Sequence, residues 1–333
     1  MSGQRYVKVF VVVLLLLSTG CTTLNSERED TKTVIDKGAP NYCIWENDRK
    51  VSWLECGDLE GFPVFYAHGN PGSRLEILFM EEKAREYGIR LIVFERPGIG
   101  KSDYVEGYPL LAFAQDLKRF ADEKGIQYFG LMGWSSGGPP VLAAAYYMPE
   151  RVRFVFSISG YTNFGEYNDA RKLMEEYGLY GPSLSEETPI LFKIIIRNLR
   201  RIDLFLPEYY SKISEDKMCA ADREILKNQS IADLFSHDQQ EALVGGARGT
   251  IQDLQTQWAP WEFKLEEIKV PVHIFQGKQD TFVPWQFAEH LADTIPDATL
   301  HLYDERGHLF PLSPMYQDEL FKIASSLIKT FKP

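Results

Sequence analysis

Short apolar segments alternate with helix-like segments along two parts of the chain, and this alternation restricts the fold more than any other feature. The apolar segments are PVFYAHG (63–69), RLIVFE (90–95), YFGLMGW (128–134), RFVFSIS (153–159), VPVHIFQG (270–277) and ATLHLYD (298–304). Helical patterns accompany them at 74–87, 109–124, 138–148, 285–294 and 315–330. Strands that are apolar almost throughout are typical of parallel sheets buried on both faces and connected by helices. We therefore predict an α/β fold with a mostly parallel central sheet flanked by helices.

The alternation is interrupted between residues 161 and 269, where the sequence is helix-like with few strand signals. At the other end of the domain, two short strands are predicted on either side of a turn at Asn47 and Asp48. Inserted helices of this kind cover the carboxyl ends of the strands, where open α/β sheets place their binding sites. We predict a core made of residues 41–160 and 270–333, with a helical lid at 161–269.

The first 20 residues have the pattern of a signal peptide. Two basic residues, Arg5 and Lys8, precede a nine-residue apolar run that ends at Leu17. A helix that spans a bilayer needs about 20 apolar residues, whereas the apolar region of a signal peptide needs about 7 to 15. We therefore expect export, with removal of residues 1–20.

The segment LSTGC, which ends at Cys21, resembles the lipobox of bacterial lipoproteins, although Leu17 lies one place further from the cysteine than in that motif. The resemblance implies a lipid on Cys21 and a polar tether at 21–40. It also implies a position in the cell envelope, anchored to a bacterial membrane. Ordinary secretory cleavage without lipidation is the alternative.

The formal net charge of −11 argues against a nucleic-acid partner, because phosphate binding needs clustered lysine and arginine. The one dense basic segment, RNLRR at 197–201, is typical of a solvated helix face. The apolar residues around it fit a membrane surface or a buried helix equally well. No HExxH pattern, Cys/His cluster or Asp-rich loop indicates a metal site, and we expect no cofactor.

Two of the remaining cysteines, Cys43 and Cys56, flank the turn of the predicted hairpin. In an oxidising compartment they can form a disulfide. Buried free thiols are the alternative, because the register of the two strands is not fixed by the sequence.

The segment GLMGWSSGGPPVLAAA (130–145) places small residues where a strand becomes a helix. Gly133, Ser135 and Gly137 fit the pattern G-x-S-x-G, with an apolar strand before it and an alanine-rich helix after it. Glycines at these corners allow a sharp turn that exposes the central serine at the edge of a sheet. This context predicts Ser135 as a nucleophile. The neighbouring Ser136 is not flanked by glycines at that spacing, and we expect it to offer its backbone N–H to an oxyanion.

A serine hydroxyl needs a base to become nucleophilic, and the base needs a carboxylate to orient it. Among the six histidines, His308 follows the last strand in the glycine loop DERGHLFP, where its side chain can lean over the sheet. Asp280 follows the preceding strand in the loop GKQDTFVP. The other histidines lie in predicted strands, in helices or in the loop after residue 67. Ser135, Asp280 and His308 are therefore the candidate catalytic residues.

Four motifs occur in the order found in the α/β-hydrolase superfamily, which the chain resembles across residues 45–330. HGNPGSRLE (68–76) resembles the oxyanion loop H-G-x-P-G. FERPGIGKSD (94–103) resembles the loop D-R-P-G-x-G-x-S, with Glu95 in place of the aspartate. The serine turn follows, and Asp280 and His308 then complete the nucleophile, acid and base order of the family.

The resemblance implies a role for each of these residues. Ser135 is the nucleophile, His308 is the general base and then the general acid, and Asp280 orients the imidazole. The backbone N–H groups of Ser136 and Asn70 form the oxyanion hole. Three residues of the same loop shape it without reacting: His68, Gly69 and Pro71.

These roles predict a serine hydrolase of the carboxylesterase type, which cleaves a small ester, or an amide, through an acyl-enzyme. A serine nucleophile argues against dehalogenases, which carry a similar H-G-N-P loop, and against epoxide hydrolases, because both use an aspartate as the nucleophile. A proline-iminopeptidase-like aminopeptidase stays open, although Asn70 and Ser136 depart from its motifs. A non-catalytic ligand-binding or signalling lipoprotein, and hydrolysis of a C–C bond, are further alternatives.

The predicted partner is a small-molecule substrate with an apolar acyl part. Aromatic residues of the lid region could line an acyl pocket or form the lid's own core. They include Tyr161, Phe164, Tyr167, Phe192, Tyr209, Tyr210, Trp258 and Trp261.

Overall fold

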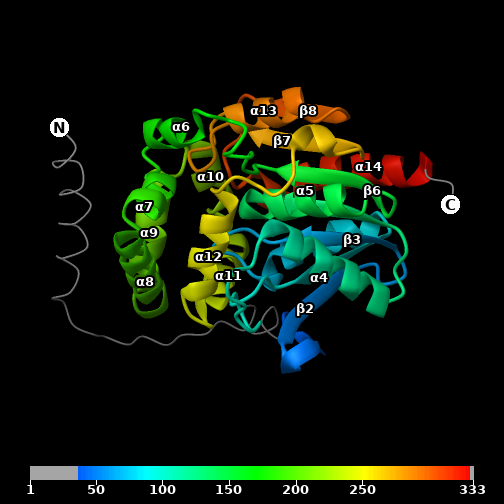
Figure 1. The fold of residues 1–333 in the computed structure, drawn as a ribbon, viewed down its shortest axis with the longest axis horizontal. Helices are drawn as coiled ribbons and strands as arrows, with labels where there is room; N and C mark the ends of the chain where they lie inside the picture. The colour runs from blue at the N-terminus through cyan, green and yellow to red at the C-terminus, as the bar shows by residue number, and fades with distance from the viewer. Residues whose placement is uncertain (1–36, 331–333) are drawn as a thin grey trace.

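The computed structural model describes residues 37–330, which form one eight-stranded sheet covered by helices (Figure 1). The strand order is β1-β2-β4-β3-β5-β6-β7-β8. β2 pairs antiparallel with both β1 and β4, and the pairs from β4 to β8 are parallel. The structure therefore confirms the predicted mostly parallel sheet.

Every apolar segment singled out in the sequence forms a strand, and the predicted hairpin at the start of the domain also forms. The strands are β1 (Asn41–Ile44), β2 (Lys50–Gly57), β3 (Phe62–Ala67), β4 (Ile89–Phe94), β5 (Phe129–Trp134), β6 (Val152–Ile158), β7 (Val272–Gly277) and β8 (Ala298–Tyr303). β5 is buried along its whole length, as expected for a central strand covered on both faces.

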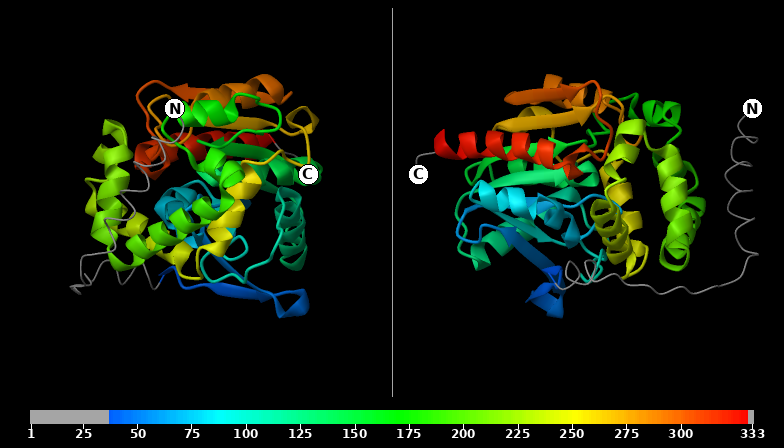
Figure 2. Two further views of the ribbon diagram at one scale, coloured as in Figure 1. Left: turned by 60° about the vertical axis from the view of Figure 1, so that its left-hand side comes forward. Right: turned by 180° about the vertical axis from the view of Figure 1, so that it is seen from behind.

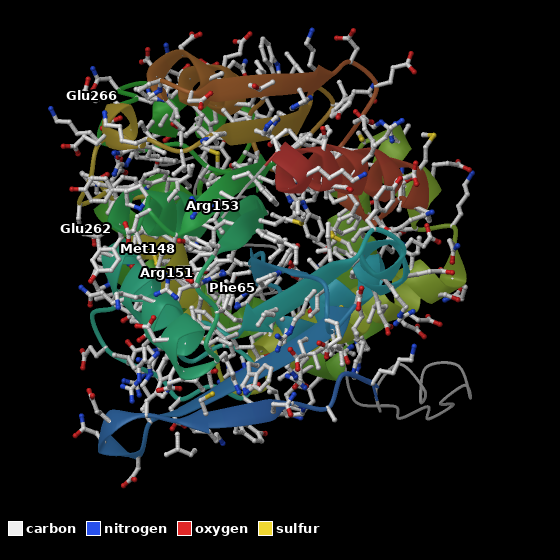
Figure 3. The ribbon with its side chains drawn as sticks, turned by 90° about the vertical axis from the view of Figure 1, so that its right-hand side faces the viewer. Phe65, Met148, Arg151, Arg153, Glu262 and Glu266 are labelled. Carbon is white, nitrogen blue, oxygen red and sulfur yellow. The ribbon has the colours of Figure 1, made fainter. Side chains whose placement is uncertain are left out.

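Helices pack on both faces of the sheet. One face is covered by α4 (Leu110–Glu123), α5 (Gly138–Tyr147) and α13 (Gln286–Thr294), and the other by α3 (Glu81–Glu86) and α14 (Pro314–Thr330). The core under the first face is rich in aromatic contacts. Phe65 of β3 lies edge-on to Phe120 and Phe129, with ring centroids 5.9 and 5.0 Å away. Figure 3, viewed from the end opposite the inserted helices, labels Phe65 near the middle of the molecule.

The single helix predicted at 74–87 is replaced by two elements. A 3₁₀-helix, η2 (Arg74–Met80), begins after Ser73, whose side chain accepts the N–H of Leu75, and α3 follows it. The first turn of η2 contains Arg74 and Glu76, each only 2% exposed. Arg74 bonds to Glu95 after β4, and Glu76 bonds to Gly69 in the loop after β3. Tertiary hydrogen bonds, rather than the 3.6-residue apolar period, therefore determine the geometry of this segment.

The interruption at 161–269 is helical, and no strand is assigned within it. Its elements are α6 (Ala170–Glu176), α7 (Gly181–Glu187), α8 (Pro189–Phe205), α9 (Pro207–Lys217), α10 (Ala220–Ile225), α11 (Gln229–Leu243), α12 (Arg248–Gln257) and η4 (Leu265–Glu267). Figures 1 and 2 show α10–α12 between the sheet and α7–α9. The inserted region therefore has an inner and an outer layer of helices.

The inner layer covers the carboxyl ends of the strands. α11 packs against η2, which follows β3. Gly249 of α12 approaches the loop after β4 so closely that a Cβ atom on Gly98 would lie 3.0 Å from its Cα. These contacts place the inserted helices over the edge of the sheet where α/β proteins bind their ligands.

The predicted signal peptide, Cys21 and most of the tether lie outside the described residues. At the start of the described part, the carbonyl of Gly38 already accepts a hydrogen bond from Arg74 Nε, at 3.0 Å. The chain thus joins the folded body before residue 41, where we expected the core to begin. From residue 37 to residue 330, no helix is both long and apolar enough to cross a membrane.

The cysteines of the hairpin are free thiols, so the disulfide hypothesis is wrong; of the two, Cys56 is buried as the alternative expected, whereas Cys43 is only partly buried. In the observed register, Cys43 pairs with Val51, which lies five residues before Cys56 on β2. Five residues of a strand span about 17 Å. The two Cα atoms are therefore far beyond the distance of about 7 Å that a disulfide can bridge.

Candidate active site

Ser135 lies at a sharp turn between β5 and α5, in the short 3₁₀-helix η3 (Ser135–Gly137). Its φ angle is +54°, a left-handed conformation that is uncommon for a residue with a side chain. The turn is closely packed, because a Cβ atom on Gly133 would lie 2.1 Å from the carbonyl oxygen of Gly137. A Cβ atom on Gly137 would lie 1.9 Å from the carbonyl oxygen of Ala67. Both glycines of the G-x-S-x-G pattern are therefore required by sterics.

His308 and Asp280 form a buried pair at the ends of neighbouring strands. Nδ1 of His308 lies 2.7 Å from Oδ2 of Asp280. The carboxylate is held in turn by the backbone N–H groups of Phe282 and Val283, which donate to Oδ1 at 2.8 and 2.9 Å. Gln276 Nε2 donates to Oδ2 at 3.1 Å. With Nδ1 bonded to the carboxylate, Nε2 is the imidazole nitrogen left for a substrate or a nucleophile.

Opposing effects act on the pKa of His308. Burial lowers the pKa of the imidazole, but the charge of Asp280, its hydrogen bond to Nδ1 and the charge of Asp222 raise it. The net pKa shift is upward. The imidazole can therefore accept a proton more readily than an isolated histidine.

The histidine loop lies against the serine turn. Trp134, which immediately precedes Ser135, donates from Nε1 to the carbonyl oxygen of His308 at 3.1 Å. The rings of Trp134 and His308 are 5.5 Å apart. On the other side of the turn, a Cβ atom on Gly69 would lie 3.7 Å from Cβ of Ser135. The loops after β3 and β8 thus lie against the serine turn, and Asp280 of the loop after β7 joins them through its bond to His308.

The buried carboxyl group of Glu76 bonds to the loop after β3. The backbone N–H of Gly69 lies 2.9 Å from both oxygens of Glu76, and Tyr66 Oη donates to Oε2 at 2.9 Å. Asp238 of α11 holds the same loop, because its Oδ1 accepts the N–H and the hydroxyl of Ser73 at 2.9 and 2.6 Å. Burial raises the pKa of Glu76 well above its usual range and that of Asp238 to about 8.

His68 is engaged within this loop on both sides of its ring. The backbone N–H of Arg96 donates to Nε2 at 3.2 Å, and Nδ1 lies 2.9 Å from the carbonyl oxygen of Gly69. This arrangement requires the proton on Nδ1. Complete burial and the nearby charge of Arg96 hold the pKa of His68 well below its usual range, so the ring is neutral.

An ion pair between Arg96 and Asp253 of α12 joins this loop to the inserted helices. Arg96 Nε and Nη2 donate to the two carboxylate oxygens at 2.7 and 2.8 Å. Arg96 also donates to the carbonyl oxygens of His68 and Gly69, at 2.6 and 3.1 Å. The side chain of Asn70 points to the same carboxylate, with Nδ2 2.7 Å from Oδ2 of Asp253. The side chain of Asn70 thus bonds to α12.

The glutamate that replaces the usual aspartate of the second motif is fully buried. Glu95 Oε1 accepts a hydrogen bond from Arg74 Nη1 at 2.8 Å, and Oε2 accepts the N–H of Lys101 at 2.8 Å. The carboxylate lies directly under the turn, since a Cβ atom on Gly100 would lie 2.1 Å from Oε1. Glu95 therefore supports the loop that follows β4.

Residues 63–313 match the family of the alpha/beta hydrolase fold. The chain belongs to this family. A proline iminopeptidase of Lactobacillus helveticus is 25% identical over 270 residues, which cover 74% of this chain and 83% of the relative. A 2-hydroxy-6-oxononadienedioate/2-hydroxy-6-oxononatrienedioate hydrolase of Cupriavidus pinatubonensis is 26% identical over 227 residues, which cover 66% of this chain and 70% of the relative.

Solved structures of α/β hydrolases show the same fold. An esterase from Exiguobacterium antarcticum superposes with a TM-score of 0.61 at 20% identity, covering 87% of this chain and 100% of the esterase. A bromoperoxidase from Bacillus anthracis gives a TM-score of 0.63 at 22% identity, covering 87% and 100% of the two chains.

Several residues of this α/β-hydrolase site were not singled out from the sequence. Glu76 and Arg96 stand within the quoted motifs, so their neighbours could have drawn attention to them. Asp253 likewise stands within GGARGTIQDL (245–254), a segment that also resembles the family. Asp222 and Asp238, in the other two inner helices, had no such signal. Helical periodicity identifies a helix but does not show which of its polar residues will face a loop distant in the sequence.

Part of the aromatic set forms a cluster next to the serine turn. Tyr161, Phe164, Phe192 and Trp258 pack with Val283 and Phe287. Tyr161 follows Gly160, where a Cβ atom would lie 3.8 Å from the carbonyl oxygen of Ser135. By contrast, Trp261 belongs to the core beneath the sheet and Tyr209 is 39% exposed.

The basic helix α8 has a mixed environment. Phe192 is buried, whereas Ile190 and Phe205 are each 76% exposed. Neither alternative from the sequence describes the whole helix. Within residues 37–330, no group of three or more His, Cys, Asp or Glu side chains could hold a metal ion.

Proposed function

We propose that this α/β hydrolase is a serine hydrolase that cleaves a small ester, or an amide, through an acyl-enzyme on Ser135. The observation that carries the proposal is the bonded pair of His308 and Asp280 packed against the left-handed turn at Ser135. A serine, a histidine and an aspartate in this order are the catalytic set of α/β-hydrolases.

The proposed reaction begins with proton transfer from Ser135 Oγ to His308 Nε2. Asp280 holds Nδ1–H and stabilises the imidazolium that forms, without taking the proton itself. The oxygen of Ser135 attacks the carbonyl carbon of the substrate, and the tetrahedral intermediate collapses as His308 protonates the leaving group. Water then attacks the acyl-enzyme as His308 takes its proton, and the second tetrahedral intermediate collapses as His308 returns that proton to Ser135 Oγ and the acid is released.

The proposed oxyanion hole uses two backbone N–H groups, of Ser136 and of Asn70. The N–H of Gly69 is bonded to Glu76, so we assign the donor from this loop to Asn70. Each donor of this kind contributes about 3 to 4 kcal/mol to transition-state stabilisation. We propose that His68, Gly69 and Pro71 shape the loop, which agrees with the neutral, doubly bonded ring of His68.

We propose an apolar acyl part for the substrate, because the aromatic cluster around Tyr161 and Trp258 adjoins the serine turn. Two other reactions draw support from relatives of similar identity: aminopeptidase activity of the proline-iminopeptidase kind, and hydrolysis of a C–C bond. A non-catalytic ligand-binding lipoprotein has less support, because it would not need the bonded pair of His308 and Asp280.

A substrate panel tests these proposals. The purified protein is incubated with p-nitrophenyl esters of increasing acyl length, with proline p-nitroanilide and with a 2-hydroxy-6-oxodienoate. We expect turnover of the esters that is lost in Ser135→Ala. Turnover of the anilide or the dienoate alone would support the corresponding alternative, and no turnover of any would favour the binding protein.

We also propose export and lipidation at Cys21, on the basis of the N-terminal sequence. Labelling of growing bacteria with radioactive palmitate tests this proposal. The wild-type protein should carry the label and sediment with membranes, whereas Cys21→Ser should lack the label and lose the membrane fraction. An unlabelled, soluble wild-type protein would support simple secretory cleavage.

A further inference from the structure

Each of the three inner helices of the inserted region carries one aspartate, fully buried on α10 and α11 and partly buried on α12, that bonds to a loop of the sheet domain. Asp222 of α10 accepts the backbone N–H groups of His308 and Leu309, at 2.9 and 2.8 Å. Asp238 of α11 accepts both donors of Ser73. The carboxylate of Asp253 on α12 accepts hydrogen bonds from the side chains of Arg96 and Asn70. Each of these bonds therefore joins an aspartate to a loop of the candidate active site and not to its own helix.

The burial of these carboxyl groups makes the contacts costly to break. Asp222 is 0% exposed, Asp238 is 1% exposed and the side chain of Asp253 is 11% exposed. A buried carboxyl group that loses its hydrogen-bond partners loses the interactions that compensate for its removal from water. Movement of α10–α12 away from the sheet would separate all three groups from their partners at once.

The outer layer differs from the inner layer. Ile190 and Phe205 at the two ends of α8 are 76% exposed, and Leu206, directly after α8, is 42% exposed. Large apolar side chains at the surface contribute little packing energy. The outer layer contacts the sheet domain through Phe192, which packs in one cluster with Val283 and Phe287, and through the carbonyl of Lys217, which accepts a hydrogen bond from Thr281 Oγ1 at 2.7 Å.

We propose that α10–α12 are a fixed frame for the catalytic loops, with Asp222, Asp238 and Asp253 as positioning residues. The inference rests on the proposed function, because it concerns the loops that hold His308 and Asn70.

Asp222 positions the general base through the backbone. Its two oxygens bind two successive N–H groups, and a Cβ atom on Gly307 would lie 2.3 Å from Oδ1. The carboxylate therefore lies directly beneath the chain at His308. Two negative groups face this imidazole, Asp280 at Nδ1 and Asp222 below the backbone, and both favour its protonated form.

Asp238 and Asp253 position the oxyanion loop from two sides. Asp238 holds Ser73, at the start of η2. Asp253 holds Arg96, which donates to the carbonyl oxygens of His68 and Gly69, directly before Asn70. The direction of the Asn70 N–H group thus depends on a side chain of the inserted region.

Amide hydrogen exchange tests whether the three aspartates hold these loops, and it does not require a substrate. The experiment uses the mature protein, purified after its natural processing in the cell. We compare Asp222→Asn, Asp238→Ala and Asp253→Asn with the wild type, in peptides that cover 305–312 and 68–76. An asparagine at 222 has only one oxygen, so its NH₂ group would face one of the two N–H groups, of His308 or Leu309, which would then lose its acceptor. The exchange rate of amides in 305–312 should therefore rise at least tenfold. Asp238→Ala and Asp253→Asn should raise exchange at 68–76 and leave 305–312 unchanged.

Matched variants separate these effects from general damage. Glu224→Gln alters a carboxylate on α10 that is 70% exposed, and it should behave as wild type. Asp238→Asn retains an oxygen that can accept both Ser73 bonds, so it should protect 68–76 as the wild type does. If Asp222→Asn does not fold, Gly307→Ala tests the same contact, because its Cβ atom displaces the carboxylate.

Kinetics on a responsive ester provide the second readout. Asp222→Asn should lower kcat at least tenfold, leave KM within threefold and move the acid limb of the pH profile to lower pH. A merely structural role would not move that limb. Exchange rates in the three variants equal to those of Glu224→Gln would overturn the frame. A wild-type protein that hydrolyses nothing but shows the predicted exchange would refute the proposed function alone.

Discussion

His308 Nδ1 lies 2.7 Å from Asp280 Oδ2, and this bond leaves Nε2 as the imidazole nitrogen that the proposed mechanism assigns to the proton of Ser135. The carboxylate cannot rotate freely, because the N–H groups of Phe282 and Val283 bind its other oxygen. The relationship therefore has direct consequences for catalysis and for its pH dependence.

Replacement of Asp280 by asparagine should remove most activity and leave the fold intact. An amide at this position offers NH₂ to Nδ1, which favours the tautomer with the proton on Nε2, where it cannot accept a proton from Ser135. We expect kcat/KM on an ester to fall by about 10⁴, as in other triads. Asp304→Asn, whose carboxylate is 80% exposed, is the control and should be fully active. A loss below tenfold in Asp280→Asn would contradict the assignment.

The activity should rise with pH through the pKa of His308. The imidazole acts as a base only when it is deprotonated, and the charges of Asp280 and Asp222 raise its pKa above the usual 6.5 against the opposing effect of burial. The midpoint of the acid limb of kcat/KM should therefore lie above pH 6.5. A midpoint at or below pH 6.5, measured with a substrate that does not titrate in this range, would show that another group controls the reaction.

Gly137→Ala should destabilise the protein strongly. Its Cβ atom would lie 1.9 Å from the carbonyl oxygen of Ala67, a backbone atom that cannot move without shifting β3. We expect a loss of about 3 kcal/mol or more in the free energy of unfolding. Gly125→Ala is the control: its φ is +67° but nothing lies within 4 Å of the new atom, so a loss of about 1 kcal/mol is expected. Equal losses in urea denaturation would contradict this steric explanation.

The stability of the protein should decrease as pH rises from about 4 to about 8. Burial raises the pKa of Asp238 to about 8 and that of Glu76 well above its usual range. The folded state therefore retains protons that the unfolded state releases from about pH 4 upward, and each retained proton contributes a slope of about 1.4 kcal/mol per pH unit. Asp238→Asn, which resembles the neutral acid, should flatten the dependence. An unchanged slope in this variant would show that Asp238 is ionised throughout.

The sheet and the proposed triad could be predicted because both depend on local sequence patterns. Strands such as β5 are buried along their whole length, and the two glycines around Ser135 mark a turn that no larger residue can form. Asp280 and His308 were found because each follows a strand in a loop at the same edge of the sheet. The structure brings these two together as expected.

The supports of the site could not be predicted, because they depend on contacts between distant parts of the chain. Asp222 is 86 residues before His308, whose backbone it binds, and Asp238 is 165 residues after Ser73. Arg74 at the start of η2 is a further case, since it bonds to Glu95 and to Glu241 of α11. Patterns of apolar residues identify these elements but carry no information on such polar pairs.

Covalent labelling with a fluorophosphonate tests the central claim most directly, because the probe reacts with a serine that a histidine activates. The purified wild-type protein is labelled, digested and analysed by mass spectrometry beside Ser135→Ala, His308→Ala and the neighbouring control Ser136→Ala, which keeps its backbone N–H. We predict a label on Ser135 in the wild type and in Ser136→Ala, and none in the other two variants. A folded wild-type protein that is not labelled, or a label that persists in Ser135→Ala, would contradict the account.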